Sequence, residues 1–346
     1  MRTPGLVDLQ ANGFAGVDFN AGASHSGDAL DHALAAMLAT GVTACLPTVI
    51  TAPPAALLER LAALDAAVSA SRLGPAMCPG YHLEGPFLQP APGYAGCHPA
   101  EAMAPPDYRL VQRLEAALSR PILLLTVAPE LEGAEAFIRQ ARAVGKLVAI
   151  GHSAATLAQV RRAAEAGAGL STHLGNGLPP ALAKLDNPLM AQLAEDRLVA
   201  TFIADGIHLP PHALGVMLRA KGPGRCALVT DATAAAAAPP GRHPFAGMAV
   251  ERGADGAVRV PGAASLAGSS LCLDAAMRNV VGWGIASVAE AIAMAATVPA
   301  ALLAPALAAH GLPWHPGEAA WSDGLRPCEA RVSGWLWRVG RGLAAG

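Results

Sequence analysis

The stretch Val199–Asp231, VATFIADGIHLPPHALGVMLRAKGPGRCALVTD, holds one full repeat of the pattern that decides the fold. It opens with the apolar run Val199–Ala204 and closes with the apolar run Ala227–Thr230. Between them, Pro211–Lys221 has a helical pattern. Short apolar runs without polar alternation are typical of parallel strands buried on both faces. The stretch therefore predicts a strand–helix–strand unit of a parallel sheet.

The same alternation covers most of the chain. Besides the two runs above, the expected strands are Leu6–Leu9, Val42–Val49, Met77–Leu83, Ile122–Val127, Leu147–Ile150 and Leu170–His173. The other expected helices are Gly27–Ala39, Ala55–Ala70, Pro106–Ser119, Leu131–Val144, Ala154–Ala166 and Asn187–Asp196. Eight alternations predict an α/β protein whose sheet closes into a (β/α)₈ barrel, which needs about 250 residues. We expect residues 1–310 to form this barrel and residues 311–346 to form a C-terminal tail with remnant β-strands, because EARVSGWLWRV alternates.

Composition narrows the class of protein. The formal net charge is −2, which gives no basis for binding nucleic acid or an anionic membrane. The six cysteines are scattered without a C-x-x-C pair, which is typical of free thiols in a reducing compartment. The uncharged stretch Ala33–Leu58 is long enough to span a bilayer, but Gly41, Pro47 and Pro53 divide it. No signal-peptide core precedes Asp8, so we expect a cytoplasmic protein without a membrane segment.

Polar residues gather where the predicted strands end, and barrel active sites are built at the carboxyl ends of the strands. These residues are Gln10, Glu84, His152, His173, His208 and Asp231. One histidine at a strand end is more often a hydrogen-bonded structural group, and Asp231 alone could be a helix cap or turn residue. Six such strand ends favour a catalytic site instead.

Two histidines and a glutamate that converge match a catalytic metal site, which leaves one position open for water. A divalent metal lowers the pKa of bound water towards neutrality and polarises a carbonyl. A carboxylate opposite, here Asp231, can take the proton of the water and deliver it to a leaving nitrogen. Histidine and carboxylate ligands suit Zn, Fe, Co and Ni, so the ligand types do not select the metal, and zinc is taken as the first candidate.

At these residues the sequence resembles the N-acetylglucosamine-6-phosphate deacetylases of the amidohydrolase superfamily. The matching segments are GLVDLQANGFAGVDFN, TACLPTVIT, YHLEGPFL, GHSAAT, STHLGNGLP, ADGIHL, LVTDATA and SLAGSSL, in family order. The resemblance implies a barrel of the metal-dependent amidohydrolase type. It also implies hydrolysis of N-acetyl-D-glucosamine 6-phosphate to glucosamine 6-phosphate and acetate in a homodimer.

The resemblance further implies a role for each matching residue. One metal ion would be held by Glu84, His152 and His173, because Gln10-Ala11-Asn12 replaces the His-x-His pair that holds a second metal in most amidohydrolases. Asp231 would be the general base and acid, and Gln10 would orient water, with ordinary loop hydrogen bonding as its alternative. His98 and His208 would contact the sugar or polarise the acyl carbonyl.

Two departures from the family pattern affect the expectation. The chain begins almost at the first barrel strand, so the flanking β-sandwich should be reduced or absent. The arginine that binds phosphate in the family is replaced by Lys184, which could equally be a solvated residue at a helix start. The backbone amides of Asn176 and Gly177 are the other candidates for binding phosphate. Two alternatives therefore stay open: a deacetylase of an unphosphorylated amino sugar or other N-acyl substrate, and a non-catalytic binding barrel.

Overall fold

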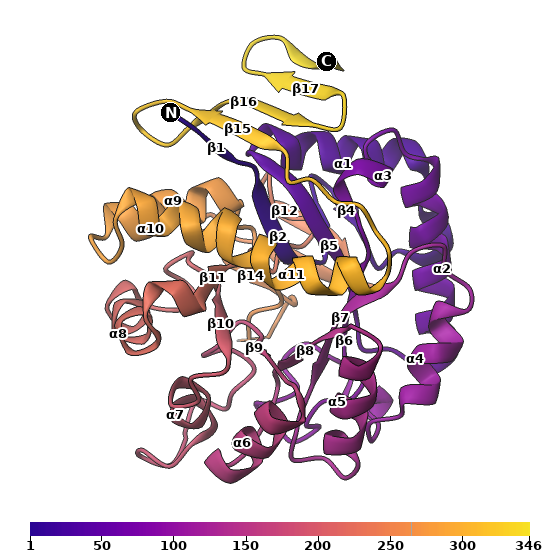
Figure 1. Cartoon of the computed structure of the whole chain (residues 1–346), viewed down its shortest axis with the longest axis vertical. Coiled ribbons are helices and arrows are strands. Elements are labelled where there is room, and N and C mark those ends of the chain that lie inside the picture. The colour runs from indigo at the N-terminus through magenta and orange to yellow at the C-terminus, as the bar shows by residue number, and fades with distance from the viewer. Residues whose placement is uncertain (264) are drawn as a thin grey trace.

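The computed structural model of the chain describes residues 1–263 and 265–346. Its largest sheet has eight strands in the order β11-β10-β9-β8-β7-β6-β5-β2, and every neighbouring pair is parallel (Figure 1). The strands are β2 (Leu6–Ala11), β5 (Val42–Ile50), β6 (Tyr81–Glu84), β7 (Ile122–Val127), β8 (Leu147–Ile150), β9 (Leu170–Ser171), β10 (Val199–Phe202) and β11 (Cys226–Leu228). A parallel bridge between Ala11 and Ala232 joins the two edges. The predicted (β/α)₈ barrel is confirmed.

Helices surround the barrel, and their ends follow local sequence signals. They are α1 (Gly27–Ala39), α2 (Pro54–Ala70), α4 (Tyr108–Glu115), α5 (Ala134–Ala143), α6 (Leu157–Ala166), α7 (Pro188–Leu193) and α8 (Pro211–Lys221). Ser26 caps α1 by accepting a hydrogen bond from the backbone N–H of Ala29. Thr156 and Gln159 form a capping box at the start of α6.

The predicted start of the third barrel strand is wrong. Met77, expected to begin the third strand, lies in the short helix α3 (Gly74–Met77), and β6 begins only at Tyr81. The hydroxyl of Ser71 accepts a hydrogen bond from the N–H of Gly74, which starts this helical turn. Pro79 then follows the turn, and proline cannot continue a helix with a regular hydrogen bond.

Three further helices follow the barrel strands: α9 (Leu273–Gly282), α10 (Val288–Ile292) and, after the π-helical turn η4 (Ala293–Thr297), α11 (Val298–Ala309). The continuous helix Val288–Ala309 is apolar and long enough to cross a membrane, a test that core helices also pass. It packs against barrel strands, including β2 and β11.

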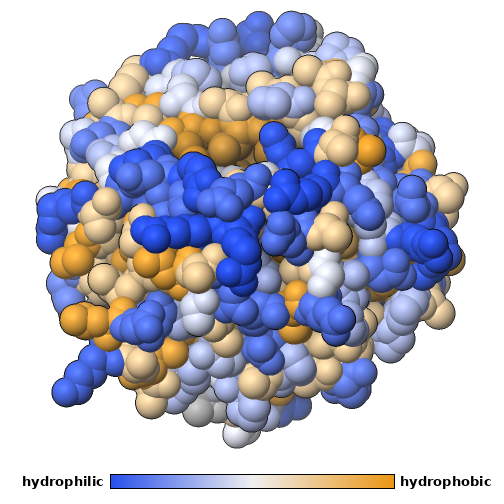
Figure 2. Space-filling model, turned by 60° about the horizontal axis from the view of Figure 1, so that its bottom comes forward, coloured by the Kyte–Doolittle hydropathy of each residue, from blue (hydrophilic) through white to orange (hydrophobic). Residues whose placement is uncertain are grey.

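Figure 2 shows an apolar patch between hydrophilic side chains on one face of the molecule.

Both ends of the chain enter a second sheet. Its five strands lie in the order β1 (Arg2–Pro4), β15 (Glu318–Trp321), β16 (Pro327–Val332), β17 (Trp335–Arg338) and β18 (Gly342–Ala345). This sheet stands beside the barrel in Figure 1 and packs on α1 through β16 and β17. Of these strands, β1 comes from the N-terminal end of the described chain and the other four from its C-terminal end. The division at residue 310 stays a prediction.

Short elements lie in the connections between the barrel strands and helices. The hairpin β3 (Gly13–Phe14) and β4 (Val17–Asp18) follows β2, and a three-stranded sheet joins β12 (Gly241–Phe245), β13 (Met248–Arg252) and β14 (Val258–Arg259). The remaining elements are the 3₁₀ turns η1 (Gly22–Ser24), η2 (Ala100–Ala102) and η3 (Pro223–Arg225). Phe245 of β12 is buried with Ile50 of β5 in a small apolar cluster.

Candidate active site

The first barrel strand places three polar side chains on one line. Asp8 and Gln10 of β2, and Asn12 directly after the strand, alternate with Leu9 and Ala11, so they point to the side opposite to those apolar side chains. All three are buried, and each meets the segment that follows β11. This seam between the first and last strands of the barrel therefore has polar partners on both sides.

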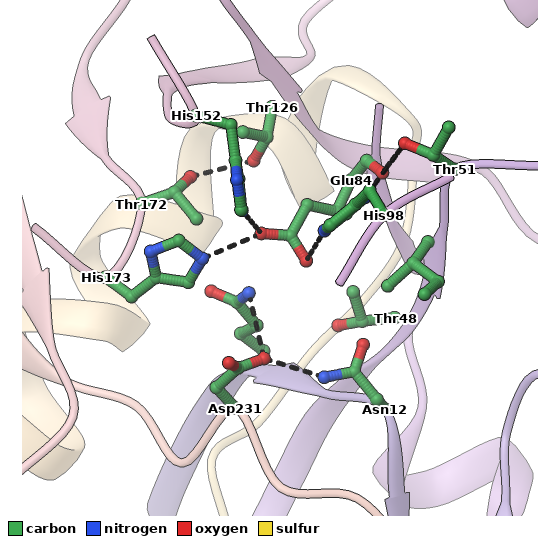
Figure 3. A network of polar contacts seen from close by, with 12 residues as sticks. Asn12, Thr48, Thr51, Glu84, His98, Thr126, His152, Thr172, His173 and Asp231 are labelled. Carbon is green, nitrogen blue, oxygen red and sulfur yellow. Dashed lines mark hydrogen bonds and ion pairs between the residues drawn. The ribbon is translucent and has the colours of Figure 1, made fainter. Parts of the chain in front are cut away.

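Glu84, at the end of β6, is the centre of a cluster of imidazoles. Its Oε1 lies 3.0 Å from Nε2 of His173 and 3.4 Å from Nε2 of His152, and its Oε2 lies 3.8 Å from Nε2 of His98 (Figure 3). All four side chains are buried. The ligand atoms of Glu84, His98 and His152 lie within 4.8 Å of one another. These residues could hold a metal ion.

Hydrogen bonds outside the cluster fix two of the rings. The Nδ1–H of His152 donates to the carbonyl of Tyr94 at 2.6 Å, and Nδ1 of His98 lies 2.9 Å from the hydroxyl of Thr51. Metal-bound histidines are typically held in this way through the second ring nitrogen. Nε2 of His152 and Nδ1 of His173 are buried without a hydrogen-bond partner among the described residues. An unpartnered buried nitrogen beside a carboxylate, as at Nε2 of His152, is what a metal site requires, whereas the nitrogen of His173 that faces Glu84 is Nε2.

Backbone strain marks the same residues. His152, His173 and Asp231 have φ values of 50°, 28° and 49°, in the left-handed region that residues other than glycine rarely adopt. Such conformations persist where the surrounding structure enforces them, and they gather at functional sites. Gly177 is the close neighbour of His152, because a Cβ at position 177 would stand 2.7 Å from the imidazole Nδ1.

The two acidic groups of the site titrate differently. Burial would raise the pKa of Glu84, but the imidazoles of His152 and His173 outweigh burial and hold this pKa well below its usual range. Burial and the negative charge of Glu84 raise the pKa of Asp231 to about 6. One carboxyl is thus kept ionised, while the other can exchange a proton near neutral pH. This pairing is suited to general acid–base chemistry.

A cavity of about 590 Å³ opens over these groups. Its polar lining includes Glu84, the three histidines of the cluster, Asp231 and His208. Nδ1 of His208 lies 2.6 Å from Oδ2 of Asp205. The cavity volume and its convergent polar groups fit a small-molecule site.

The structure brings most of the predicted site residues together. Asn176 and Gly177 line the cavity, but Lys184 does not. Pro180 lines the cavity, whereas residues 183–186 are exposed. Lys184 therefore lies in a part of the loop that faces solvent. Gln10 is buried and donates from Nε2 to Oδ1 of Asp231 at 3.2 Å.

Sequence reasoning missed two kinds of contact. It did not assign the amide of Asn12, which donates to Oδ1 of Asp231 at 2.7 Å, and it placed His98 on the substrate without expecting it so close to Glu84. The supports Tyr94, Thr51 and Asp205 were not expected either. Alternation along β2 could have pointed to Asn12, because it shares a face with Gln10.

A parallel barrel whose carboxyl end gathers a glutamate, three histidines and an aspartate beside a cavity has the architecture of an amidohydrolase. No family model matches the chain. The N-acetylgalactosamine-6-phosphate deacetylase of Escherichia coli O157:H7 is 35% identical over 301 residues, 87% of this chain and 77% of that protein. The N-acetylglucosamine-6-phosphate deacetylase of Bos taurus is 34% identical over 311 residues, 87% of this chain and 74% of that protein.

A solved structure gives the same result. A mutant N-acetyl-D-glucosamine-6-phosphate deacetylase from Mycobacterium smegmatis, in complex with N-acetyl-D-glucosamine-6-phosphate, superposes with a TM-score of 0.84 and 29% identity. The alignment covers 95% of this chain and 85% of that one. The chain belongs to the N-acetylglucosamine-6-phosphate deacetylase family.

Proposed function

We propose that the protein hydrolyses the acetamide of N-acetyl-D-glucosamine 6-phosphate, giving glucosamine 6-phosphate and acetate. The observation that carries the proposal is the cavity in which the Glu84–histidine cluster and Asp231 line the same space. Membership of a deacetylase family supports the reaction, and the relative solved with N-acetyl-D-glucosamine-6-phosphate supports the substrate.

The metal is assigned to Glu84, His152 and His173, with zinc as the first candidate. When bound, the metal supplies an activated water and polarises the acyl oxygen. The unpartnered Nε2 of His152 and the approach of Nε2 of His173 to Glu84 at 3.0 Å support this assignment. His98 lies near enough to Glu84 to be an additional ligand, and its other proposed role is to donate to the acyl oxygen.

Asp231 would take a proton from the attacking water and give it to the sugar nitrogen as the C–N bond breaks. Its raised pKa of about 6 supports both transfers, because a group that titrates near the working pH can accept and donate. His208, held by Asp205, would donate to a sugar hydroxyl or to the phosphate from the other side of the cavity.

A second substrate class has structural support. No lysine or arginine is among the described residues that line the cavity. A phosphate dianion would then depend on His208 and on the backbone amides near Asn176 and Gly177, while Lys184 could contribute only from outside the cavity. An unphosphorylated N-acetyl amino sugar is therefore the alternative substrate.

The test is acetate release from four substrates: N-acetylglucosamine, N-acetylgalactosamine and their 6-phosphates. We expect the highest kcat/KM with N-acetylglucosamine 6-phosphate, and Asp231→Asn serves as the inactive control. Failure to release acetate from all four, with metal bound, would overturn the proposal. Higher kcat/KM for an unphosphorylated sugar would establish the alternative. A cytoplasmic location and a homodimer, the latter implied by the resemblance, are part of the proposal, and cell fractionation and sedimentation test them.

A further inference from the structure

The two carboxylate oxygens of Asp231 have different surroundings. Oδ1 accepts hydrogen bonds from two side-chain amides, at 2.7 Å from Nδ2 of Asn12 and at 3.2 Å from Nε2 of Gln10. Figure 3 shows the Asn12 amide directed at this carboxylate from below the Glu84 cluster. None of the described residues donates to Oδ2, although Asp231 lines the cavity. One oxygen is therefore anchored, and the other is free to meet a ligand.

Asn12 is itself held firmly. It is only 1% exposed, its backbone N–H donates to the carbonyl of Ala232 at 2.7 Å, and its carbonyl accepts from the N–H of Phe19 at 2.8 Å. The backbone N–H of Asp231 in turn donates to the carbonyl of Gln10 at 2.9 Å. The segments that carry Asn12 and Asp231 are thus joined by backbone bonds, and the two residues themselves by a side-chain bond. A buried side chain on so fixed a backbone can select one rotamer of its neighbour.

Asp231 needs such a restraint. Its φ of 49° is a backbone conformation that residues other than glycine rarely adopt. A short hydrogen bond from an amide to an ionised oxygen is about twice as strong as one between neutral groups. Asn12 makes the shorter of the two bonds to Oδ1, so it is the principal restraint.

We propose that Asn12 is a positioning residue for the deacetylation: its amide fixes Oδ1 of Asp231, so that Oδ2 is the oxygen that carries the proton. The water oxygen forms a bond to the acyl carbon as its proton passes to Oδ2. The same proton then passes from Oδ2 to the sugar nitrogen as the C–N bond breaks, which leaves the amine and acetic acid. The inference rests on the proposed function.

The first test compares Asn12→Ala with Gln10→Ala, which removes the longer bond to the same oxygen. We expect Asn12→Ala to lower kcat about 10- to 100-fold, with KM changed less than threefold and the metal retained, because the bond acts on proton transfer and not on binding. Gln10→Ala should lower kcat less. A kcat within threefold of the wild type for Asn12→Ala, or a rise in KM that accounts for the loss, would overturn the proposal.

The second test is a double-mutant cycle. If Asn12 acts through Asp231, adding Asn12→Ala to Asp231→Asn should lower kcat no further. If the two residues act independently, the fold losses in kcat of the single variants should multiply in the double variant. Asn12→Ala should also move the acid limb of the kcat/KM profile to higher pH, because it removes a donor to the ionised form of Asp231. Additive losses would overturn the proposal.

Two controls separate the possible failures. Asn12→Val fills most of the space of the amide and has no donor, so it must be at least as impaired as Asn12→Ala. The valine variant replaces the alanine variant in the test if the latter is unstable by thermal melting, and wild-type kcat in the valine variant would overturn the proposal. A wild type that releases no acetate from any N-acetylhexosamine would instead contradict the proposed function.

Discussion

The hydroxyl of Thr230 donates a hydrogen bond of 2.6 Å to Oδ2 of Asp8, across the seam where the last barrel segment meets the first strand. The backbone N–H of Thr230 also donates to Oδ1 of the same carboxylate. Burial nevertheless raises the pKa of Asp8 to about 7, because it outweighs these hydrogen bonds. The seam therefore contains a group that titrates near neutral pH.

Asp8→Asn should change how stability depends on pH. Because the folded pKa of Asp8 is raised, its protonated form contributes stability below about pH 4, and this contribution is lost as the pH rises through about 7. Asparagine does not ionise, and the Thr230 hydroxyl can turn to donate to the carbonyl of Gln10, which is 3.2 Å away. In denaturant unfolding, the free energy of unfolding of the variant relative to that of the wild type should rise by roughly 2 kcal/mol between pH 5 and pH 8. Parallel pH dependences for the two proteins would contradict the assignment.

Single substitutions should show which of the candidate residues bind the metal. Glu84→Ala, His152→Ala and His173→Ala should each lose the metal, because each would delete one of the three proposed ligands. Elemental analysis of the wild type should show one metal ion per chain. His98→Ala should keep it if His98 only faces the substrate. Loss of metal from His98→Ala would make His98 a ligand, and two tightly held metals in the wild type would contradict the mononuclear site.

Asp231→Asn should keep the fold and the metal but lose about 10²- to 10⁴-fold in kcat, because an amide cannot shuttle the proton. Steady-state kinetics at saturating substrate measures the loss, and elemental analysis supplies the control. A near-normal kcat at neutral pH would remove Asp231 from the mechanism.

Truncation after Ala320 should destabilise the whole protein. It deletes β16 and β17, whose Val332 is buried and whose Trp335 packs on the core, with the guanidinium of Arg72 5.6 Å from the Trp335 ring. We expect aggregation or a large fall in Tm, since α1 would lose its cover. Truncation after Arg338 removes only β18 and is the matched control. A soluble product of unchanged Tm would show the tail to be dispensable.

The barrel was predictable because its determinants are local. Apolar runs such as Ile122–Val127 are buried along their whole length, and helix starts such as Ser26 are encoded by neighbouring residues. The boundary at Met77 failed because an apolar residue before Pro79 fits a strand or a helical turn equally well. Short apolar runs do not distinguish the two by periodicity.

The site was only partly predictable because its contacts join distant segments. Strand ends indicated Glu84, His152, His173 and Asp231, since a barrel collects such positions at one mouth. The bond between Asn12 and Asp231 spans 219 residues and depends on the register at which the barrel closes. No local pattern encodes that register. Nor does a local pattern encode the hydrogen bond between His152 and the carbonyl of Tyr94.

The pairing of β1 with β15 has a consequence for synthesis. Thr3 receives a hydrogen bond from the indole of Trp321, 318 residues further along the chain. A ribosome releases the first partner long before the second exists, so the side sheet forms only after the whole barrel has emerged. Until then the apolar flank of α1 is exposed on the nascent chain, which is when a chaperone would be needed most. Contacts of such long sequence separation also slow folding, so we expect this sheet to be the last part of the protein to assemble.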